Sequence, residues 1–305
     1  MSNSLPPRII DTHVHVWDWQ APWMAWLEDR PASWNVVRRN FSWQDLSYEL
    51  DAAGIAELFL VQASPSCEES RMFLELADRE ASILGVVGWV SLRSGAATEA
   101  DLKTLEGVGA GKLVGVRNNH GWLPDGDILA TPAVIDSCRL LAERKLNLDL
   151  HFRDYRELPL ALKLAAEVPE LALIIDHLGK PLIKDADAFE PWAQTMAKLS
   201  EIPNLFLKYS GWATFLGRAQ ASDVRRYIEY ALEKFGPDRM MFGSNWPVAL
   251  VADSYEATFR ATLDALPALS EADMNNILRE TAVRCYLDRG ATSRGGAVDD
   301  HSGEP

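Results

Sequence analysis

The feature that most constrains the fold is a series of eight short runs rich in Val, Ile, Leu and Phe, each bounded by turn residues. Their starts recur roughly every 30 residues, the length of one strand-and-helix unit, with a longer interval after the first run. Strands that alternate with helical patterns indicate a parallel sheet. Eight units predict a single-domain (β/α)8 barrel of the TIM type, although a doubly wound sheet uses the same alternation. The expected strands span residues 9–16, 57–63, 83–92, 113–118, 146–152, 171–177, 205–211 and 240–245.

The composition limits the partners that the chain can have. Of 305 residues, 48% are hydrophobic and 24% charged, as in ordinary globular proteins. The net charge of −14 gives little support for nucleic acid or an anionic membrane as partner. The sequence contains no membrane-length apolar run, and its first residues lead us to expect no secretory signal. Cys67, Cys138 and Cys285 are few and far apart, so we expect no disulfide framework. We therefore expect a cytoplasmic protein that acts on a small molecule, as a monomer or a homodimer.

The segments between and beyond the expected strands differ in character. Helices are expected over 66–80, 132–145, 222–235 and 270–287. The long connection 17–43 holds six of the eleven Trp residues, and long connections inside compact domains are often functional. These Trp side chains either pack the connection onto the barrel rim or form a lid over a pocket, and both interpretations stay open. The barrel is expected to span 8–288, followed by a disordered tail over 289–305.

The first expected strand carries two histidines separated by one residue. Side chains alternate along a strand, so Asp11, His13 and His15 share one face. The other face, with Ile10 and Val14, is apolar and is expected to meet the surrounding helices. The polar face is therefore expected to point into the barrel, where active sites of such folds lie at the carboxyl ends of the strands.

Two more histidines lie at the ends of later strands. Asn147, Asp149 and His151 form the polar face of the fifth strand, and His177 ends the sixth. Imidazoles two residues apart on a strand are roughly 6–7 Å apart along the backbone, close enough to hold one metal ion. The sequence therefore predicts a histidine cluster at the mouth of the barrel, with separate buried core histidines as the alternative.

Four motifs carry a family resemblance. They are Asp-Thr-His-Val-His at 11–15, Ile-Asp-His-Leu-Gly-Lys-Pro at 175–181, Lys-Tyr-Ser-Gly at 208–211 and Met-Phe-Gly-Ser-Asn-Trp-Pro at 241–247. Together they resemble the amidohydrolase superfamily over about residues 8–288, and more narrowly its lactonase-rich branch. That branch includes sugar-acid lactonases such as fuconolactonase and relatives of the pyrone-dicarboxylate lactonase.

The resemblance implies a set of ligands and a catalytic residue. A divalent metal, with zinc favoured, would be bound by His13, His15, His151 and the residue at position 245. His177 would be an acid/base or a group that polarises the carbonyl. Some lactonases of the branch need no metal, and their strand-eight carboxylate activates the water, so metal-independent catalysis is the alternative.

The sequence departs from the family pattern at Asn245, where the motif usually has Asp. An amide is no general base, and it is a poorer metal ligand than a carboxylate. Three explanations stay open. Asn245 is natural and His177 or His151 is the base; Asp was replaced by Asn to trap a complex; or catalysis has been lost or changed.

Four residues are candidates for substrate binding. Arg117, on the fourth strand, presents a planar fork suited to a carboxylate or a lactone carbonyl, with a rim ion pair as the alternative. His120 follows that strand and lines the same mouth or an exposed loop. Lys208 is expected to face inward, where a Lys must be paired or desolvated. Trp26 and its neighbours in the long connection are expected to cover a sugar ring.

The sequence thus predicts a hydrolase that opens a lactone of a sugar acid or a related small carboxylic acid. Arg117, His177 or a metal would polarise the ester carbonyl, and His151, His177 or a metal-bound water would supply the base. The alternatives are a metal-dependent decarboxylase of the same superfamily and a binding barrel disabled by Asn245.

Overall fold

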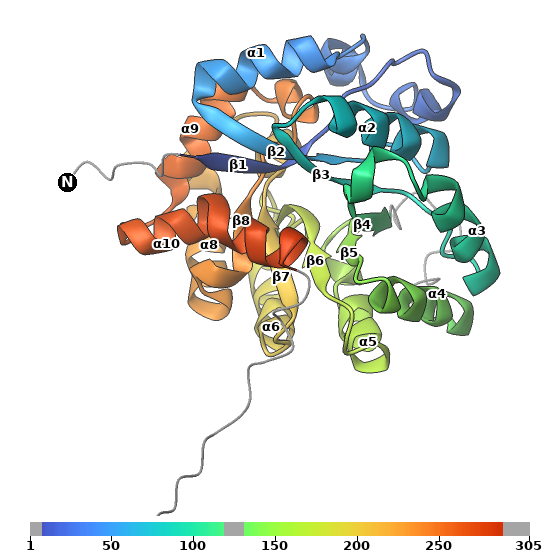
Figure 1. Cartoon of the computed structure of the whole chain (residues 1–305). Coiled ribbons are helices and arrows are strands. Elements are labelled where there is room, and N and C mark those ends of the chain that lie inside the picture. Colours follow the sequence, from blue (N-terminus) through green and yellow to red (C-terminus); the bar gives the residue numbers. More distant parts are fainter. Residues whose placement is uncertain (1–7, 119–130, 289–305) are drawn as a thin grey trace, which may run out of the picture.

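The computed structural model describes residues 8–118 and 131–288. Eight parallel strands follow one another in sequence order around a single sheet, and the helices lie around them (Figure 1). The strands are β1 (Ile9–Val14), β2 (Ile55–Val61), β3 (Ile83–Gly88), β4 (Leu113–Asn118), β5 (Asn147–Leu150), β6 (Leu173–Ile175), β7 (Leu205–Tyr209) and β8 (Met240–Phe242).

The sheet closes on itself where β1 meets the segment after β8. Val14 pairs in parallel with Trp246, and the amide of His15 donates to the carbonyl of Trp246 at 2.8 Å. The amide of Asn245 donates to the carbonyl of His13 at 2.8 Å. These bonds confirm the (β/α)8 barrel, and they bring the first and last of the four motifs, 11–15 and 241–247, side by side.

The helices begin at residues that suit helix starts. Ser42 forms a capping box with Asp45, and the side chains of Ser66, Ser94 and Thr131 accept from the first turns of their helices. The helices are α1 (Trp43–Ala53), α2 (Cys67–Arg79), α3 (Gly95–Leu105), α4 (Pro132–Glu143), α5 (Pro159–Glu167), α6 (Phe189–Ser200), α7 (Trp212–Leu216), α8 (Ala221–Phe235), α9 (Tyr255–Ala265) and α10 (Glu271–Asn275).

Several expected elements are shorter or less regular than the sequence indicated. The sixth strand ends at Ile175, so the prediction that His177 lies at its end is wrong. The expected helix 270–287 is a short α-helix followed by wider π-type turns over Asn276–Glu280 and Val283–Leu287. Apolar runs continue past the last hydrogen bond of the sheet because the residues beyond it are also buried. Periodicity does not distinguish buried residues within a strand from buried residues that follow it.

The prediction for the faces of β1 is also wrong in part. Ile10 packs inside the barrel with Phe59 and Tyr286, and the hydroxyl of Tyr255 on α9 donates to Asp11 at 2.7 Å. Asp11 therefore faces the helices. The ladder pairs Asp11 with Leu58 and Val14 with Leu60, so β1 contains one extra residue there. Such a bulge reverses which side chains face inward, and this is why His13 still points into the barrel.

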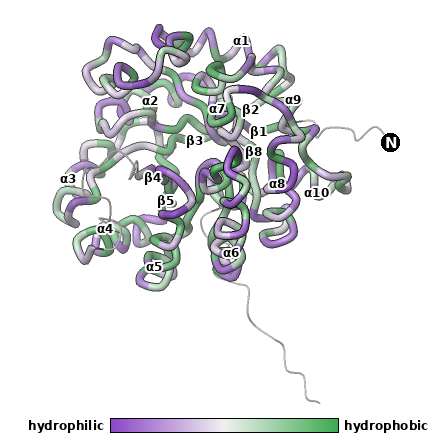
Figure 2. The backbone as a smooth tube through the Cα atoms, turned by 180° about the vertical axis from the view of Figure 1, so that it is seen from behind, coloured by the Kyte–Doolittle hydropathy of each residue, from purple (hydrophilic) through white to green (hydrophobic). Residues whose placement is uncertain are grey.

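The long first connection is more ordered than a loop. It contains two 3-10 helices, Pro22–Leu27 and Ala32–Val37, and Trp43 begins α1. The guanidinium of Arg38 donates to the carbonyls of Leu27, Glu28 and Arg30. These hydrogen bonds hold the two 3-10 helices of the connection together. Figure 2 shows largely hydrophobic residues along β3 and mixed hydropathy along the outer helices. Among the described residues, none of the helices combines the length and apolarity that crossing a membrane requires.

Candidate active site

A cavity of about 640 Å³ opens at the carboxyl ends of the strands. Its floor is formed by residues at or just beyond the strand ends: His15, Arg117, His151, His177 and Asn245. Its side is formed in part by the first connection, through Trp26, Arg30 and Trp34. We call these two groups, with the buried His13 and Asp176 added to the first, the histidine floor and the tryptophan wall.

The four predicted histidines lie together on the floor. The ring centres of His13 and His15 are 5.0 Å apart, those of His13 and His177 4.6 Å, and those of His151 and His177 5.5 Å. All four side chains are nearly or fully buried. Counting strands therefore predicted which histidines meet, although His177 lies beyond the end of β6.

Hydrogen bonds fix two of the imidazoles and leave the others open. His15 Nδ1 lies 2.7 Å from the carbonyl of Val61, and His177 Nδ1 lies 2.8 Å from the Ser210 hydroxyl. His13 Nε2 and His151 Nδ1 are buried and have no hydrogen-bond partner in the described structure. His13 and His151 thus each have a nitrogen available to a ligand or a reacting group.

The imidazoles are neutral near pH 7. Burial lowers the pKa of His13, His151 and His177 well below 6.5, and nearby positive charges or a neighbouring histidine lower each further. Burial likewise lowers the pKa of His15 to about 3. Neutral imidazoles can accept a proton or bind a metal, which is the chemistry that the histidine pattern predicted.

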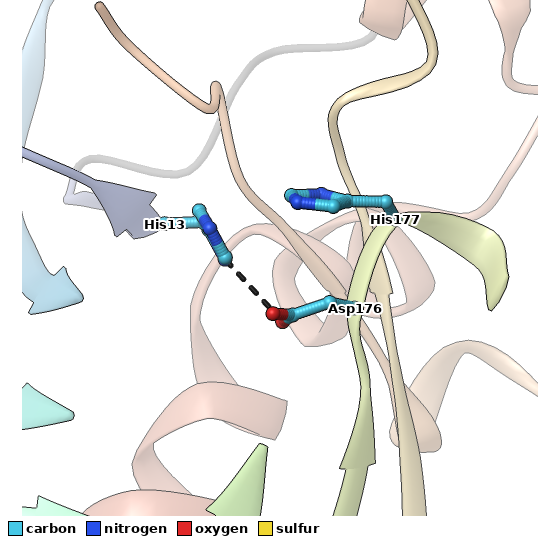
Figure 3. A group of neighbouring side chains, drawn as sticks. All are labelled: His13, Asp176 and His177. Atoms are coloured by element: carbon cyan, nitrogen blue, oxygen red, sulfur yellow. Dashed lines mark ion pairs between the residues drawn. The ribbon is translucent and has the colours of Figure 1, made fainter. Parts of the chain in front are cut away.

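A buried ion-pair network lies beneath the histidines. Asp176 Oδ2 lies 3.0 Å from Arg117 Nε, and its Oδ1 lies 3.6 Å from Lys208 Nζ and 3.4 Å from His13 Nδ1 (Figure 3). Burial raises the pKa of the Asp176 carboxyl, but Lys208 and Arg117 outweigh it and the pKa is lowered. Asp176 is therefore ionised beneath the imidazoles.

Lys208 faces inward as expected and is paired, but it does not line the cavity. Its ammonium donates to Asp149, which also accepts from the Tyr286 hydroxyl at 2.9 Å, and it lies 3.4 Å from His13 Nδ1. The side chain is fully buried. Lys208 therefore supports the floor from below. The prediction that it binds substrate stays untested, and its buried position argues against direct contact.

The contacts of the histidine floor explain three residues of the Lys-Tyr-Ser-Gly motif. Lys208 provides the buried cation and Ser210 the hydrogen bond to His177. Gly211 has a φ of +67°, and a Cβ there would lie 2.5 Å from His177 Nδ1. Only glycine leaves room for the imidazole at this point.

His177 belongs to a turn of left-handed residues. The φ angles of His177, Leu178, Gly179 and Lys180 are +56°, +56°, +69° and +48°. Each such non-glycine residue costs about 1–2 kcal/mol. Trp192 Nε1 donates to the carbonyl of Leu178 at 2.8 Å, which helps to hold the turn. Strain of this kind collects at functional sites, and here it directs both His177 and Lys180 to the cavity.

Sequence reasoning gave no role to Asp176 or Lys180, although both stand in a motif that carried the resemblance. Asp176 lies under His13 and His177, and Lys180 lines the cavity. The ion pairs of Asp176 reach residues far away in the chain, and the position of Lys180 depends on the left-handed turn. In the sequence, the motif itself was the only signal for either residue. Asn245 also has a positive φ, +64°, and lines the cavity beside His15.

The donors on the floor fit a divalent metal ion. Ligand atoms of His13, Asp176 and His177 lie within 4.8 Å of one another, and His13 Nε2 has no hydrogen-bond partner among the described residues. Neutral imidazoles with one carboxylate are ligands that suit zinc. This group differs from the expected set of His13, His15 and His151, which stays a prediction.

The tryptophan wall combines aromatic rings with a cation. Arg30 lies over the rings of both Trp26 and Trp34, 5.4 Å from each centre, and Trp26 Nε1 donates to the Ser64 hydroxyl at 3.0 Å. Trp26 thus lines the cavity where the sequence placed a cover for the substrate. His120 and the tail 289–305 lie outside the described residues.

The family model named Amidohydrolase matches residues 10–287. The chain belongs to the amidohydrolase family. This confirms the resemblance carried by the four motifs. The L-fucono-1,5-lactonase of Burkholderia multivorans is 31% identical over 296 residues, which cover 91% of this chain and 95% of that protein.

Solved structures agree with the family. A crystal structure of a Burkholderia multivorans amidohydrolase with bound zinc has a TM-score of 0.83 and 30% identity, covering 92% of this chain and 99% of that one. A 2,6-dihydroxybenzoate decarboxylase has a TM-score of 0.65 and 19% identity, covering 94% and 100%. At that identity the decarboxylase shares the fold alone.

Proposed function

We propose that this amidohydrolase-family protein hydrolyses the ring ester of a sugar-acid lactone. The observation that carries the proposal is the histidine floor, where neutral imidazoles and Arg117 converge on one cavity. The similarity to a fucono-lactonase over nearly the whole chain supports an ester substrate of this kind. The cavity volume of about 640 Å³ suits a single sugar-sized ligand.

His177 is the proposed general base. A neutral His177 that donates its Nδ1 proton to Ser210 presents a basic Nε2, and a base oriented by a third group is the usual arrangement. His151 has no such partner on Nδ1. The ionised Asp176 nearby favours the imidazolium that forms when His177 takes a proton.

The hydrolysis then follows from the positions of these groups. His177 takes a proton from water, whose oxygen bonds to the lactone carbonyl carbon. Arg117 donates to the carbonyl oxygen as negative charge develops there. The ring C–O bond breaks, and the proton on His177 passes to the departing oxygen, which leaves an open hydroxy acid. Asn245 donates a hydrogen bond that orients the water. The family pattern has at this position a carboxylate that activates the water.

His13, Asp176 and His177 would hold a divalent ion if the protein uses one. When bound there, the metal would supply Lewis-acid polarisation of the ester carbonyl. The roles of Arg117 and Asn245 at the cavity do not depend on it.

The deciding measurement is proton release from a panel of sugar-acid and dicarboxylate lactones, with chelated protein and with added zinc or manganese. Hydrolysis well above the spontaneous rate supports the proposal and names the lactone. If none of the lactones is hydrolysed above the spontaneous rate, the proposal is contradicted. Release of carbon dioxide from unsaturated carboxylic acids would support the decarboxylase instead.

Asn245→Asp separates a natural asparagine mechanism from a disabled site. Because His177 is the proposed base, the variant should keep kcat within an order of magnitude of the parent. A rise from no turnover to rapid turnover in the same assay would show that the carboxylate is the missing base. Circular dichroism of both proteins confirms that the fold is unchanged.

A further inference from the structure

A second hollow opens beside the cavity of the candidate active site. It has a volume of about 360 Å³, and three residues, Arg153, Lys180 and Phe215, line both hollows. The rest of its lining comes from residues 181–185 and from Leu216. We call this hollow the annex. The proposed hydrolysis makes no use of it, because the residues assigned to the reaction all line the larger cavity.

The two hollows differ in chemistry. The floor of the larger cavity presents imidazoles, a guanidinium and an amide. The annex is lined mainly by apolar side chains, those of Pro181, Leu182, Ile183, Phe215 and Leu216. Leu182 and Phe215 are each 39% exposed, and exposed apolar side chains that gather in one hollow are typical of a surface that binds a ligand. A molecule that occupies both hollows therefore needs a polar part and an apolar part.

The charged residues at the annex do not select a charged group. Arg153 forms an ion pair with Glu157. Lys184 and Asp185 carry opposite charges, and both are exposed to water. Exposed charges are well solvated and contribute little to binding. The apolar surface between them is therefore what the annex offers to a ligand.

The annex adjoins the proposed base. The centre of the Phe215 ring lies 6.0 Å from that of His177. The left-handed turn that holds His177 leads directly into residues 181–185. Gly211, which leaves room for the imidazole, directly precedes α7, and α7 ends with Phe215 and Leu216. A lactone whose ester lies at His177 can therefore extend a substituent past Phe215 into the annex.

We propose that the substrate is a lactone whose ring carries an apolar substituent, an alkyl or aryl group, and that this substituent binds in the annex. The inference rests on the proposed lactonase function and deepens it by naming a class of substrate. The larger cavity already suits a sugar-sized ring, so the annex is left for a further group. Its volume and its continuity with that cavity suit part of a small molecule.

The test uses the 6-O-alkyl ethers of hexono-1,4-lactones, from methyl to hexyl, in the galacto, gluco and manno series. For the full chain, kcat/KM should rise about twofold for each added methylene, mainly through KM. This is roughly half the effect of full burial, because the exposed Leu182 and Phe215 leave the annex open to water. The hexyl member should exceed the methyl member by about 30-fold. Hydrolysis that does not depend on chain length would overturn the proposal.

Leu182→Asn replaces an apolar side chain of the annex with a polar one of similar size. Among the described residues, Leu182 lines the annex and not the larger cavity. The variant should lower the ratio of kcat/KM between the hexyl and methyl members by at least about threefold. An unchanged ratio would place the alkyl group elsewhere, for example on the tryptophan wall, and overturn the proposal.

Leu287→Asn is the matched control. Leu287 is also 39% exposed, and within the described part of the chain it lines neither hollow. The control should keep the ratio of the parent. An equal fall in both variants would show that the effect does not come from the annex.

Calorimetry with the open-chain acids of the same ethers separates this inference from the proposed function. Their affinity should rise with chain length, and Leu182→Asn should weaken the rise. If no lactone is hydrolysed but this binding holds, the lactonase function is wrong and the annex stands. If lactones are hydrolysed but neither rate nor affinity depends on chain length, the function stands and the annex is wrong. A dimer that Leu182→Asn dissociates in sedimentation, together with a flat series, would make the annex an interface between two copies instead.

Discussion

The histidine floor and the tryptophan wall face the same cavity but are built in different ways. On the floor, His13, His177 and Asp176 are buried and are held by strand ends, a left-handed turn and ion pairs that reach across the barrel. On the wall, Trp26 and Trp34 are only half-buried and lie on 3-10 helices of one surface connection. The floor is therefore suited to fixed chemistry, and the wall to the choice of substrate.

Replacing the proposed base gives the largest effect expected on the floor. His177→Asn should lower kcat by about 10²- to 10⁴-fold, the usual contribution of a general base. Melting temperature should change little, because Asn can still bond to Ser210. A variant that keeps kcat and raises KM would assign His177 to binding, and the division between floor and wall would fail.

The buried cation beneath the floor is expected to act on stability. Lys208→Met leaves Asp149 buried without its ion-pair partner and should cost about 3–5 kcal/mol of unfolding free energy, measured in urea. The double variant Asp149→Asn with Lys208→Met removes both charges and should recover most of that loss. If the double variant is no more stable than the single one, the pair does not explain the effect.

Glu69 is hydrogen-bonded to the segment that holds the wall residue Trp26. Its carboxyl accepts from the amides of Ala63 and Ser64, and the Ser64 hydroxyl accepts from Trp26. Burial raises the pKa of Glu69 from 4.5 to about 8. Between these values the folded state holds a proton that the unfolded state releases, so stability should fall as pH rises through this range.

The slope from this group is at most about 1.4 kcal/mol per pH unit. Glu69→Gln keeps the neutral acceptor and should remove this part of the pH dependence. Urea unfolding at several pH values from 5.5 to 8.5, for parent and variant, measures it. Parallel stability curves for the two proteins would show that Glu69 does not titrate in the folded state in this range.

The smallest expected effect belongs to the wall. Trp26→Ala removes an indole that lines the cavity and should raise KM by up to about tenfold while kcat changes little. Trp23→Ala is the control, because Trp23 lies in the same 3-10 helix and does not line the cavity. A fall in kcat for Trp26→Ala without a change in KM would show that the wall shares in the chemistry.

The sequence predicted the histidines of the floor better than the turn and the ion pairs that hold them in place. The spacing of the apolar runs gave the barrel and the strand order, and strand ends are where parallel strands bring side chains together. His13, His15, His151 and His177 could therefore be assigned to one site. Alternation on the fifth and seventh strands also placed Asp149 and Lys208 correctly inside the barrel.

What the tertiary structure decided was the direction and pairing of individual side chains. One extra residue in β1 turned Asp11 outward and kept His13 inward, and strict alternation does not include such a bulge. The left-handed turn after β6 placed Asp176 and Lys180. Asp149 and Tyr286 are bonded although they lie 137 positions apart in the chain. Local pattern fixes which elements form, but burial, closure of the barrel and ion pairing determine which groups meet within the site.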